Sequence, residues 1–252
     1  MEWNVVPTGI KELDAMLGGG VLDDSVLLII YDTNSFGWVL SVKLFKSFLD
    51  RGCFGVVTNY SLPIGLLEKY GGMMGFDVEE RGNAGQLAII DVFGASHDLT
   101  LDIPYVYSPG RIDSSTFLPK MVELYYEILK KSGGRKPIGL TVGMDGLAQI
   151  FDEETAMKIL RRNIMMKEAA RVTERRERPI NIMIVNRDRV SKKYISWLFH
   201  YAEHVIDFEP TERPGLEKMI IRKSLLPDFE PSLAEFTYSK GQIKIRRIRG
   251  II

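Results

Sequence analysis

Short apolar runs alternate with segments of helical periodicity along most of the chain. Buried strands are predicted at five runs rich in valine, isoleucine and leucine: 26–30, 53–58, 87–92, 137–144 and 180–185. Helices are predicted where apolar residues recur three or four positions apart: 38–48, 62–74, 117–131 and 152–178. Strands that alternate with helices pair in parallel and carry helices on both faces. The pattern therefore predicts an α/β fold with a three-layer α/β/α core and a mostly parallel sheet.

Two stretches lack this alternation. Residues 1–24 form a lead-in, in which Thr8 is the expected N-cap of a short helix that ends at a glycine triplet. Residues 93–115 show no period and contain prolines and tyrosines, which predicts a long excursion with room for a short hairpin. Asp113 or Ser114 is expected to cap the helix that follows.

The end of the chain returns to strands. After a predicted helix, strand patterns recur at 204–208, 219–223 and 233–248, and the last two predict closing antiparallel strands. The chain is thus predicted to be a single domain with three parts: a lead-in at 1–24, a parallel core at 25–208 and C-terminal antiparallel strands at 209–252.

A polar turn joins the first strand of the core to its first helix, where an α/β chain can carry a phosphate-binding loop. That loop requires Gly, four residues, Gly, Lys, and then Ser or Thr. The four defining positions are occupied by Tyr31, Phe36, Gly37 and Trp38. Tyr and Phe prevent the close backbone approach that glycine allows, and Trp38 cannot bind Mg²⁺ as a hydroxyl does. The nearest candidate for the loop lysine, Lys43, lies about two helical turns further on, and Asp32 adds a negative charge where a triphosphate would lie.

Composition excludes several classes of protein. The formal net charge is +0 and the pI is about 6.9, so no global field attracts nucleic acid or membrane. The sequence has one cysteine, no signal peptide and no apolar run of about 18 residues, which predicts a cytoplasmic protein. Glutamine is scarce beside abundant lysine, arginine and glutamate, a composition that indicates a thermophilic source.

Several motifs run in a familiar order. They are VPTGIKELDAMLGGGVLDDSVLLI within 5–29, KYGGMMGFD at 69–77, LAIIDVFG at 87–94, TVGMDGLAQIF at 141–151, INIMIVNRD at 180–188, AEHVIDFE at 202–209 and KMIIRKSLLPDF at 218–229. In this order they resemble the KaiC and RadA-like branch of the RecA superfamily, whose members open with an IPTGI-x-x-LD-x-LLGGG-type lead-in. The resemblance covers almost the whole chain and implies a RecA-like core.

The resemblance also implies which nucleotide-site residues are missing. The phosphate loop is degenerate at Tyr31, Phe36, Gly37 and Trp38. The family's water-orienting carboxylates match the stretch TNYS at 58–61, which has no acid. Asp145 alone matches an acid of the family, the one that holds the Mg²⁺-bound water, and a structural role for it is the stronger interpretation. Without these groups no ATP or Mg²⁺ cofactor is expected, because phosphoryl transfer depends on positioned charge.

Three other interpretations stay open at this stage. An unusual loop could still bind ATP and Mg²⁺, which would make the chain an active ATPase. Arg246, Arg247 and Arg249 belong to a basic C-terminal run that could contact nucleic acid, although the neighbouring isoleucines suit a half-buried strand. His200 and His204 are four apart but have no third ligand, so no metal site is expected.

Aromatic residues are the more suggestive candidates for binding. Phe36 and Trp38 lie where phosphates would have been, and Tyr105 and Tyr107 lie in the long excursion. They either form a surface for a peptide or protein partner or fill the vacated cleft as core. The sequence therefore predicts a pseudo-ATPase that acts as a structural or protein-interaction module. Its expected partner is a second copy or an active relative, although the recombinases' ring-linking N-terminal segment is not found.

Overall fold

The apolar runs of the sequence form the parallel centre of one sheet in the computed structural model, which describes residues 4–174 and 179–248. Neighbouring parallel strands follow the order β9 (His204–Pro210), β3 (Val26–Tyr31), β8 (Ile180–Asn186), β7 (Pro137–Val142), β4 (Phe54–Asn59), β5 (Leu87–Asp91) and β6 (Val106–Tyr107). Their runs are almost purely apolar because both faces of the sheet are covered.

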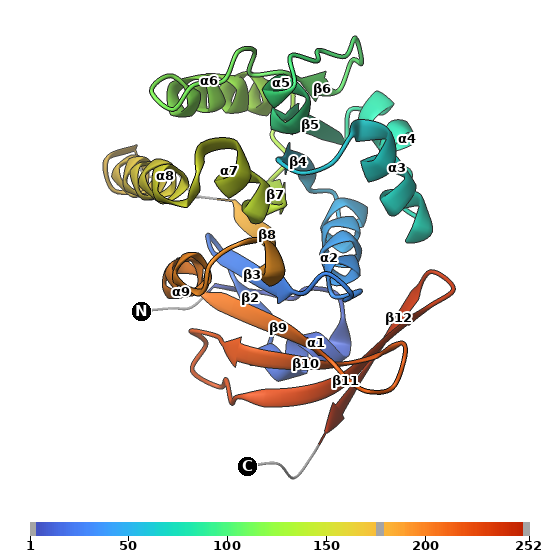
Figure 1. Cartoon of the computed structure of the whole chain (residues 1–252). Coiled ribbons are helices and arrows are strands. Elements are labelled where there is room, and N and C mark those ends of the chain that lie inside the picture. The colour runs from blue at the N-terminus through green and yellow to red at the C-terminus, as the bar shows by residue number, and fades with distance from the viewer. Residues whose placement is uncertain (1–3, 175–178, 249–252) are drawn as a thin grey trace.

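Antiparallel strands extend the sheet beyond β9. They are β10 (Leu216–Lys223), β11 (Ser232–Ser239) and β12 (Gln242–Ile248), drawn in orange and red in Figure 1. The predicted mostly parallel sheet with closing antiparallel strands is confirmed. The lead-in contributes a separate two-stranded sheet, β1 (Val5–Val6) with β2 (Val21–Leu22), which the sequence pattern did not predict.

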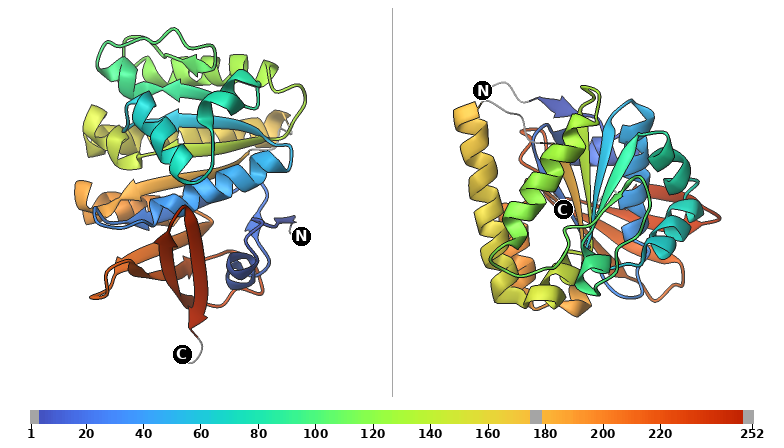
Figure 2. Two further views of the ribbon diagram at one scale, coloured as in Figure 1. Left: turned by 90° about the vertical axis from the view of Figure 1, so that its right-hand side faces the viewer. Right: turned by 90° about the horizontal axis from the view of Figure 1, so that it is seen from above.

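Two layers of helices bury alternate side chains of the strands. Leu27 and Ile29 of β3 face one apolar cluster, and Leu28 and Ile30 face the other. The first face is covered by α1 (Lys11–Leu17), α2 (Trp38–Asp50), α3 (Ile64–Met73) and α4 (Val78–Asn83). The second is covered by α6 (Phe117–Lys130), α7 (Met144–Phe151), α8 (Glu153–Glu174) and α9 (Lys192–Tyr201). Figure 2 shows these layers on either side of the sheet.

Several predicted boundaries are wrong, for local reasons. The strand predicted at 137–144 ends at Val142, because Gly143 adopts a left-handed φ of 77° and starts α7. Asp145 therefore lies in the first turn of a helix and not at a strand end. Asp152, with a φ of 68°, then separates α7 from α8. The excursion at 93–115 contains no hairpin; it holds β6, which pairs in parallel with β5, and most of α5 (Val92–Ser96).

Capping also differs from prediction. Ile10 and not Thr8 is the N-cap of α1, and the Thr8 hydroxyl instead donates to Asp14 Oδ1 at 2.6 Å. Thr116 is the N-cap of α6 without a side-chain bond, while Asp113 accepts from the Thr116 N–H at 3.0 Å one turn earlier. The described residues contain no helix long and apolar enough to span a bilayer.

Candidate functional site

The turn between β3 and α2 lies at the carboxyl edge of the parallel sheet, where α/β folds usually bind ligands. Two of the four candidate residues from the sequence are Tyr31, the last residue of β3, and Phe36, which is 41% exposed. Gly37 has a helical φ of −56°, and a side chain there would overlap the ring of Phe208 on β9. This glycine is therefore required for close packing and does not form a phosphate-binding turn.

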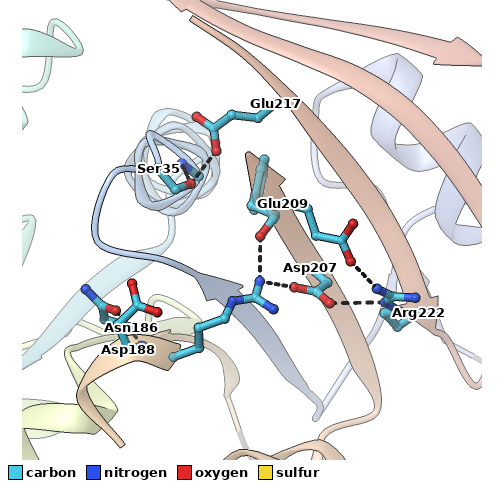
Figure 3. Close-up of polar contacts among 10 residues, drawn as sticks. Ser35, Asn186, Asp188, Asp207, Glu209, Glu217 and Arg222 are labelled. Carbon is cyan, nitrogen blue, oxygen red and sulfur yellow. Dashed lines mark hydrogen bonds and ion pairs between the residues drawn. The ribbon is translucent and has the colours of Figure 1, made fainter. Parts of the chain in front are cut away.

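Glu217 of β10 accepts two hydrogen bonds from this turn. Its carboxylate accepts from the Phe36 N–H at 2.7 Å and from the Ser35 hydroxyl, a contact drawn in Figure 3. Ser35 Oγ also accepts from the Gly37 N–H at 2.8 Å. Burial raises the pKa of Glu217, and the bonds from Ser35 and Phe36 oppose that shift. The Phe36 N–H, just before the start of α2, thus binds a carboxylate of the chain itself.

Two arginines near the turn are neutralised by acids. Arg187 donates to Asp207 and to the Phe208 carbonyl, both on β9. Arg222 of β10 forms ion pairs with Asp207 at 3.1 Å and with Glu209 at 2.7 Å (Figure 3). Both guanidinium groups are held by carboxylates, so neither presents an unpaired charge to a ligand at the turn.

The turn is also tied to the end of β8. Asp188 accepts from the Thr33 N–H at 2.8 Å, and the Asn186 amide donates to Thr33 Oγ1 at 3.3 Å. Asp32 follows β3 directly; burial raises the pKa of its carboxyl, and Arg187 lowers it. The turn is therefore fixed at both ends and lined by acidic groups.

Asp145, the acid that matches the RecA-type magnesium position, is engaged within the fold. It is 1% exposed, its Oδ1 accepts from the Asn186 N–H at 3.0 Å, and Arg189 Nη1 lies 2.9 Å from its Oδ2. Burial raises the pKa of Asp145, while the Asn186 bond and Arg189 lower it. In this arrangement Asp145 positions the end of β8 and the guanidinium of Arg189.

Two cavities lie along the same carboxyl edge, and the smaller one is lined by Thr33 and Ser35 of the turn. The smaller has a volume of about 220 Å³ and has mainly apolar and aromatic walls that include Tyr31, Trp38, Leu62, Tyr70 and Phe76. The larger has a volume of about 820 Å³ and has polar walls that include His97, Arg111, Asp113 and Gln149. Both are lined by Ser61 and Arg189, so the two cavities adjoin.

The four aromatic residues singled out from the sequence do not gather in one place. The Trp38 ring lies 4.7 Å from the ring of Tyr70 and lines the smaller cavity, whereas Phe36 lies 5.3 Å from Tyr238 of β11. Tyr105 is buried, with its ring against Gly82 and its hydroxyl donating to Glu68 at 3.1 Å. Its assignment to an exposed partner surface is therefore wrong.

Tyr107, the fourth of these aromatic residues, lies in β6. Its hydroxyl accepts from Lys131 Nζ at 2.6 Å. It lines neither of the two edge cavities.

The other candidates lie elsewhere. Arg246 and Arg247 are exposed neighbours on β12, and adjacent strand residues point to opposite faces, while Arg249 lies outside the described residues. His204 is buried on β9 and accepts from the Leu22 N–H at 2.9 Å, whereas His200 is exposed on α9. Within 4–174 and 179–248 no group of three potential metal ligands comes together.

The most important residue of the site was not predicted from the sequence. Glu217 lies 182 residues after Ser35, and a lone acid just before the strand predicted at 219–223 gives no local signal of that contact. Tyr70 could have been noticed, because it stands in the KYGGMMGFD motif, but nothing in the pattern pairs it with Trp38. Arg189 follows the INIMIVNRD motif directly and is recognised only from its contact with Asp145.

The sheet order, the closing strands and the lead-in together define a KaiC/RecA-like fold. Solved structures that share it include two from Pyrococcus horikoshii. The uncharacterised protein PH0321 from Pyrococcus horikoshii, in complex with an unknown peptide, is 21% identical, with a TM-score of 0.83 over 96% of this chain and 99% of its own. The KaiC-like protein PH0186 from Pyrococcus horikoshii OT3 is 16% identical, with a TM-score of 0.69 over 97% of this chain and 99% of its own. Searches of family profiles and of curated sequences find no match.

Proposed function

We propose that this KaiC-like chain is a peptide-binding module that neither binds nor hydrolyses nucleotide. The observation that carries the proposal is a contrast at one edge of the sheet. The Ser35 hydroxyl and the Phe36 N–H of the turn at 32–37 are bound by Glu217, while an apolar aromatic cavity beside the turn is open. A ligand at this edge is therefore expected to offer apolar side chains rather than phosphates.

Electrostatics at the turn argue against a nucleotide. A triphosphate would meet the carboxylates of Asp32 and Glu217, and the turn contains no lysine. Arg187, the arginine that lowers the pKa of Asp32, is already bound by Asp207. A nucleotide would have to break these buried contacts before it could use the turn, and like charges repel strongly where water is scarce.

The smaller cavity suits a single large apolar side chain. Its volume of about 220 Å³ is below the roughly 300–1,000 Å³ that is typical of small-molecule sites. Trp38, Tyr70 and Phe76 supply aromatic walls, and aromatic groups are common anchors of protein interfaces. The adjoining larger cavity offers Arg111, Arg189 and Gln149 to the polar groups of the flanking segment. The peptide found with the similarly folded PH0321 supports this class of ligand.

Selection from a random peptide library on the purified chain tests the proposal. Selected peptides should share one large apolar residue, and their affinity should fall at least tenfold in Leu62→Trp, because the added ring fills the smaller cavity. Leu225→Trp, at a residue that is 47% exposed and does not line the edge cavities, is the matched control. Equal binding by Leu62→Trp and Leu225→Trp would contradict the proposed site.

A further inference from the structure

The sheet ends in a strand that has a neighbour on one side only. β12 pairs with β11 along all 7 of its residues without a bulge, and no described strand lies on its other side (Figure 1). An edge strand presents every second N–H and C=O group to its open side, where another extended segment can pair with them. Proline and bulges, which block such pairing, are absent from β12.

The hairpin of β11 and β12 is held in place at its tip. Lys240 and Gly241 have left-handed φ values of 50° and 74°, which suit a two-residue turn between twisted strands. The Tyr238 hydroxyl donates to the Met73 carbonyl of α3 at 3.3 Å, and a side chain at Gly241 would come within 2.9 Å of that same oxygen. Because β12 is already ordered, a segment that pairs with it does not have to order it first.

The side chains of β12 alternate between an apolar face and a charged face. Ile243 and Ile245 are half-buried and pack against the apolar cluster that α1 and α2 cover. Lys244 and Arg246 are exposed on the opposite face. Neither cation forms an ion pair or a side-chain hydrogen bond with a described residue. A segment added to this edge would therefore meet apolar neighbours on one face and free cations on the other.

Charges of opposite sign face one another across the outer face of the antiparallel strands. In register, Glu209 of β9 lies opposite Lys218 of β10, Lys218 opposite Glu235 of β11, and Glu235 opposite Arg246 of β12. Opposite charges in facing positions stabilise neighbouring strands, and like charges destabilise them. The row ends at Arg246, because no described strand continues it. The next member of this alternating row would be an acid.

The same charges argue against a second copy of β12 as the added strand. Antiparallel self-pairing centred on Ile245 would set Lys244 of each copy against Arg246 of the other. Centring the pair on Lys244 or on Arg246 would set that cation against itself. Each of these arrangements puts like charges in facing positions and is destabilised. An acidic segment meets the opposite situation, because its carboxylates would face the cations.

A nucleic acid fits this edge less well than an acidic segment does. Arg247 lies on the opposite face from Lys244 and Arg246, so the cations of β12 do not form one surface that phosphates could follow. Phosphates also have no donors for the carbonyl groups of an edge strand, whereas the backbone of an extended segment supplies both donors and acceptors.

We propose that the free edge of β12 binds an extended acidic segment of a partner protein, which adds as a strand and places carboxylates opposite Lys244 and Arg246. The segment alternates acidic with apolar residues, so that its apolar side chains extend the face of Ile243 and Ile245. These residues of β12 line neither of the two cavities at the carboxyl edge, so the site is separate from the peptide site proposed there.

Titration of the intact protein with a labelled peptide that alternates glutamate and valine tests the proposal. Fluorescence anisotropy should show saturable binding, and hydrogen exchange should slow at the backbone amides of β12 but not at those of β6, the other edge strand. A peptide with its glutamates and valines in separate blocks should bind at least tenfold more weakly. Absence of binding, or binding without slower exchange at β12, would overturn the proposal.

Leu62→Trp separates this test from that of the peptide site. The added ring fills the smaller edge cavity, which β12 does not line. The variant should therefore bind the alternating peptide with unchanged affinity. A tenfold loss of affinity in Leu62→Trp would place the alternating peptide at the carboxyl edge and would contradict binding at β12.

Charge reversal tests the facing carboxylates. Arg246→Glu should weaken binding of the glutamate peptide at least tenfold and should allow binding of a matching peptide with lysine in place of glutamate. Lys192→Glu, at an exposed lysine in the first turn of α9, is the matched control and should change neither affinity. Equal affinities for Arg246→Glu and Lys192→Glu would contradict the proposed contact.

Methylation of the peptide backbone distinguishes strand addition from charge attraction alone. Methyl groups on alternate peptide nitrogens should abolish binding when those nitrogens face β12, and should have little effect when they face away. Equal effects of the two methylation patterns would contradict strand addition. Tighter binding of single-stranded DNA than of the glutamate peptide, weakened by Arg246→Glu, would also contradict it and would assign the cations of β12 to nucleic acid.

Discussion

The carboxyl edge of the sheet is completed in two different ways. At β3, the turn at 32–37 is closed by Glu217, Asp188 and Asn186, which bind its donors and acceptors. At β4 and β7, the chain leaves two cavities that meet at Ser61 and Arg189. One edge of the sheet is thus closed by the chain's own carboxylate at one strand and left open at the strands beside it.

The largest expected effect comes from removing the carboxylate on the closed side. Glu217→Ala should lower the free energy of unfolding by about 2 to 4 kcal/mol, because the buried Ser35 hydroxyl and the partly buried Phe36 N–H lose a charged acceptor. Glu217→Gln keeps the shape and one acceptor, so its loss should be smaller. Denaturant unfolding measures both variants. A loss below about 1 kcal/mol for Glu217→Ala would show that the turn does not depend on this contact.

A pH dependence is expected from His204, which lies opposite Leu27 near the amino end of β3 and away from the turn. Burial, with a smaller effect of Lys223, lowers the pKa of His204 to about 4 from an ordinary 6.5. The unfolded chain then binds a proton before the folded chain does, so the stability that neutral His204 contributes is complete above pH 6.5. It is lost as the pH falls towards 4, by about 3 kcal/mol in total.

His204→Gln removes this titration while keeping a polar side chain at the position. The slope of unfolding free energy against pH between 4 and 6.5 should therefore be smaller in the variant than in the parent protein. Buried Asp91, Asp145 and Glu217, whose pKa values are raised, contribute an opposite slope in both proteins and cancel in the comparison. Identical slopes would contradict a buried neutral His204.

The smallest expected effects concern two serines, Ser35 in the closed turn and Ser61 beside the open cavities. Ser35→Ala should cost about 2 kcal/mol, because the Ser35 hydroxyl both donates to Glu217 and accepts from Gly37. Ser61→Ala should cost less than about 0.5 kcal/mol, because its hydroxyl makes only a long contact of 3.4 Å with the Gly143 carbonyl. Thermal unfolding of the two variants in parallel provides the measurement. Equal losses of stability in Ser35→Ala and Ser61→Ala would mean that the two sides of the edge are equally constrained.

The fold was predictable because the strands of the parallel core are apolar runs separated by periodic helices. The short elements were not: α7 depends on the left-handed Gly143, and β6 on pairing with β5, neither of which has a periodic signal. Tyr31, Phe36 and Trp38 place the candidate site at this turn, which stays a prediction. The closure of the turn was not predictable, because Glu217 reaches it from a strand 182 residues after Ser35. The burial of Tyr105 likewise depends on Gly82, which the sequence pattern does not relate to it.

Calorimetric titration of the purified chain with ATP and Mg²⁺ tests whether the chain's own carboxylate stands in the place of nucleotide phosphates at the turn. We expect no detectable heat of binding at any of several temperatures. Binding tighter than about 100 μM, roughly −5.5 kcal/mol, that weakens in Asp145→Asn would contradict this expectation and would show that this edge of the sheet binds a nucleotide.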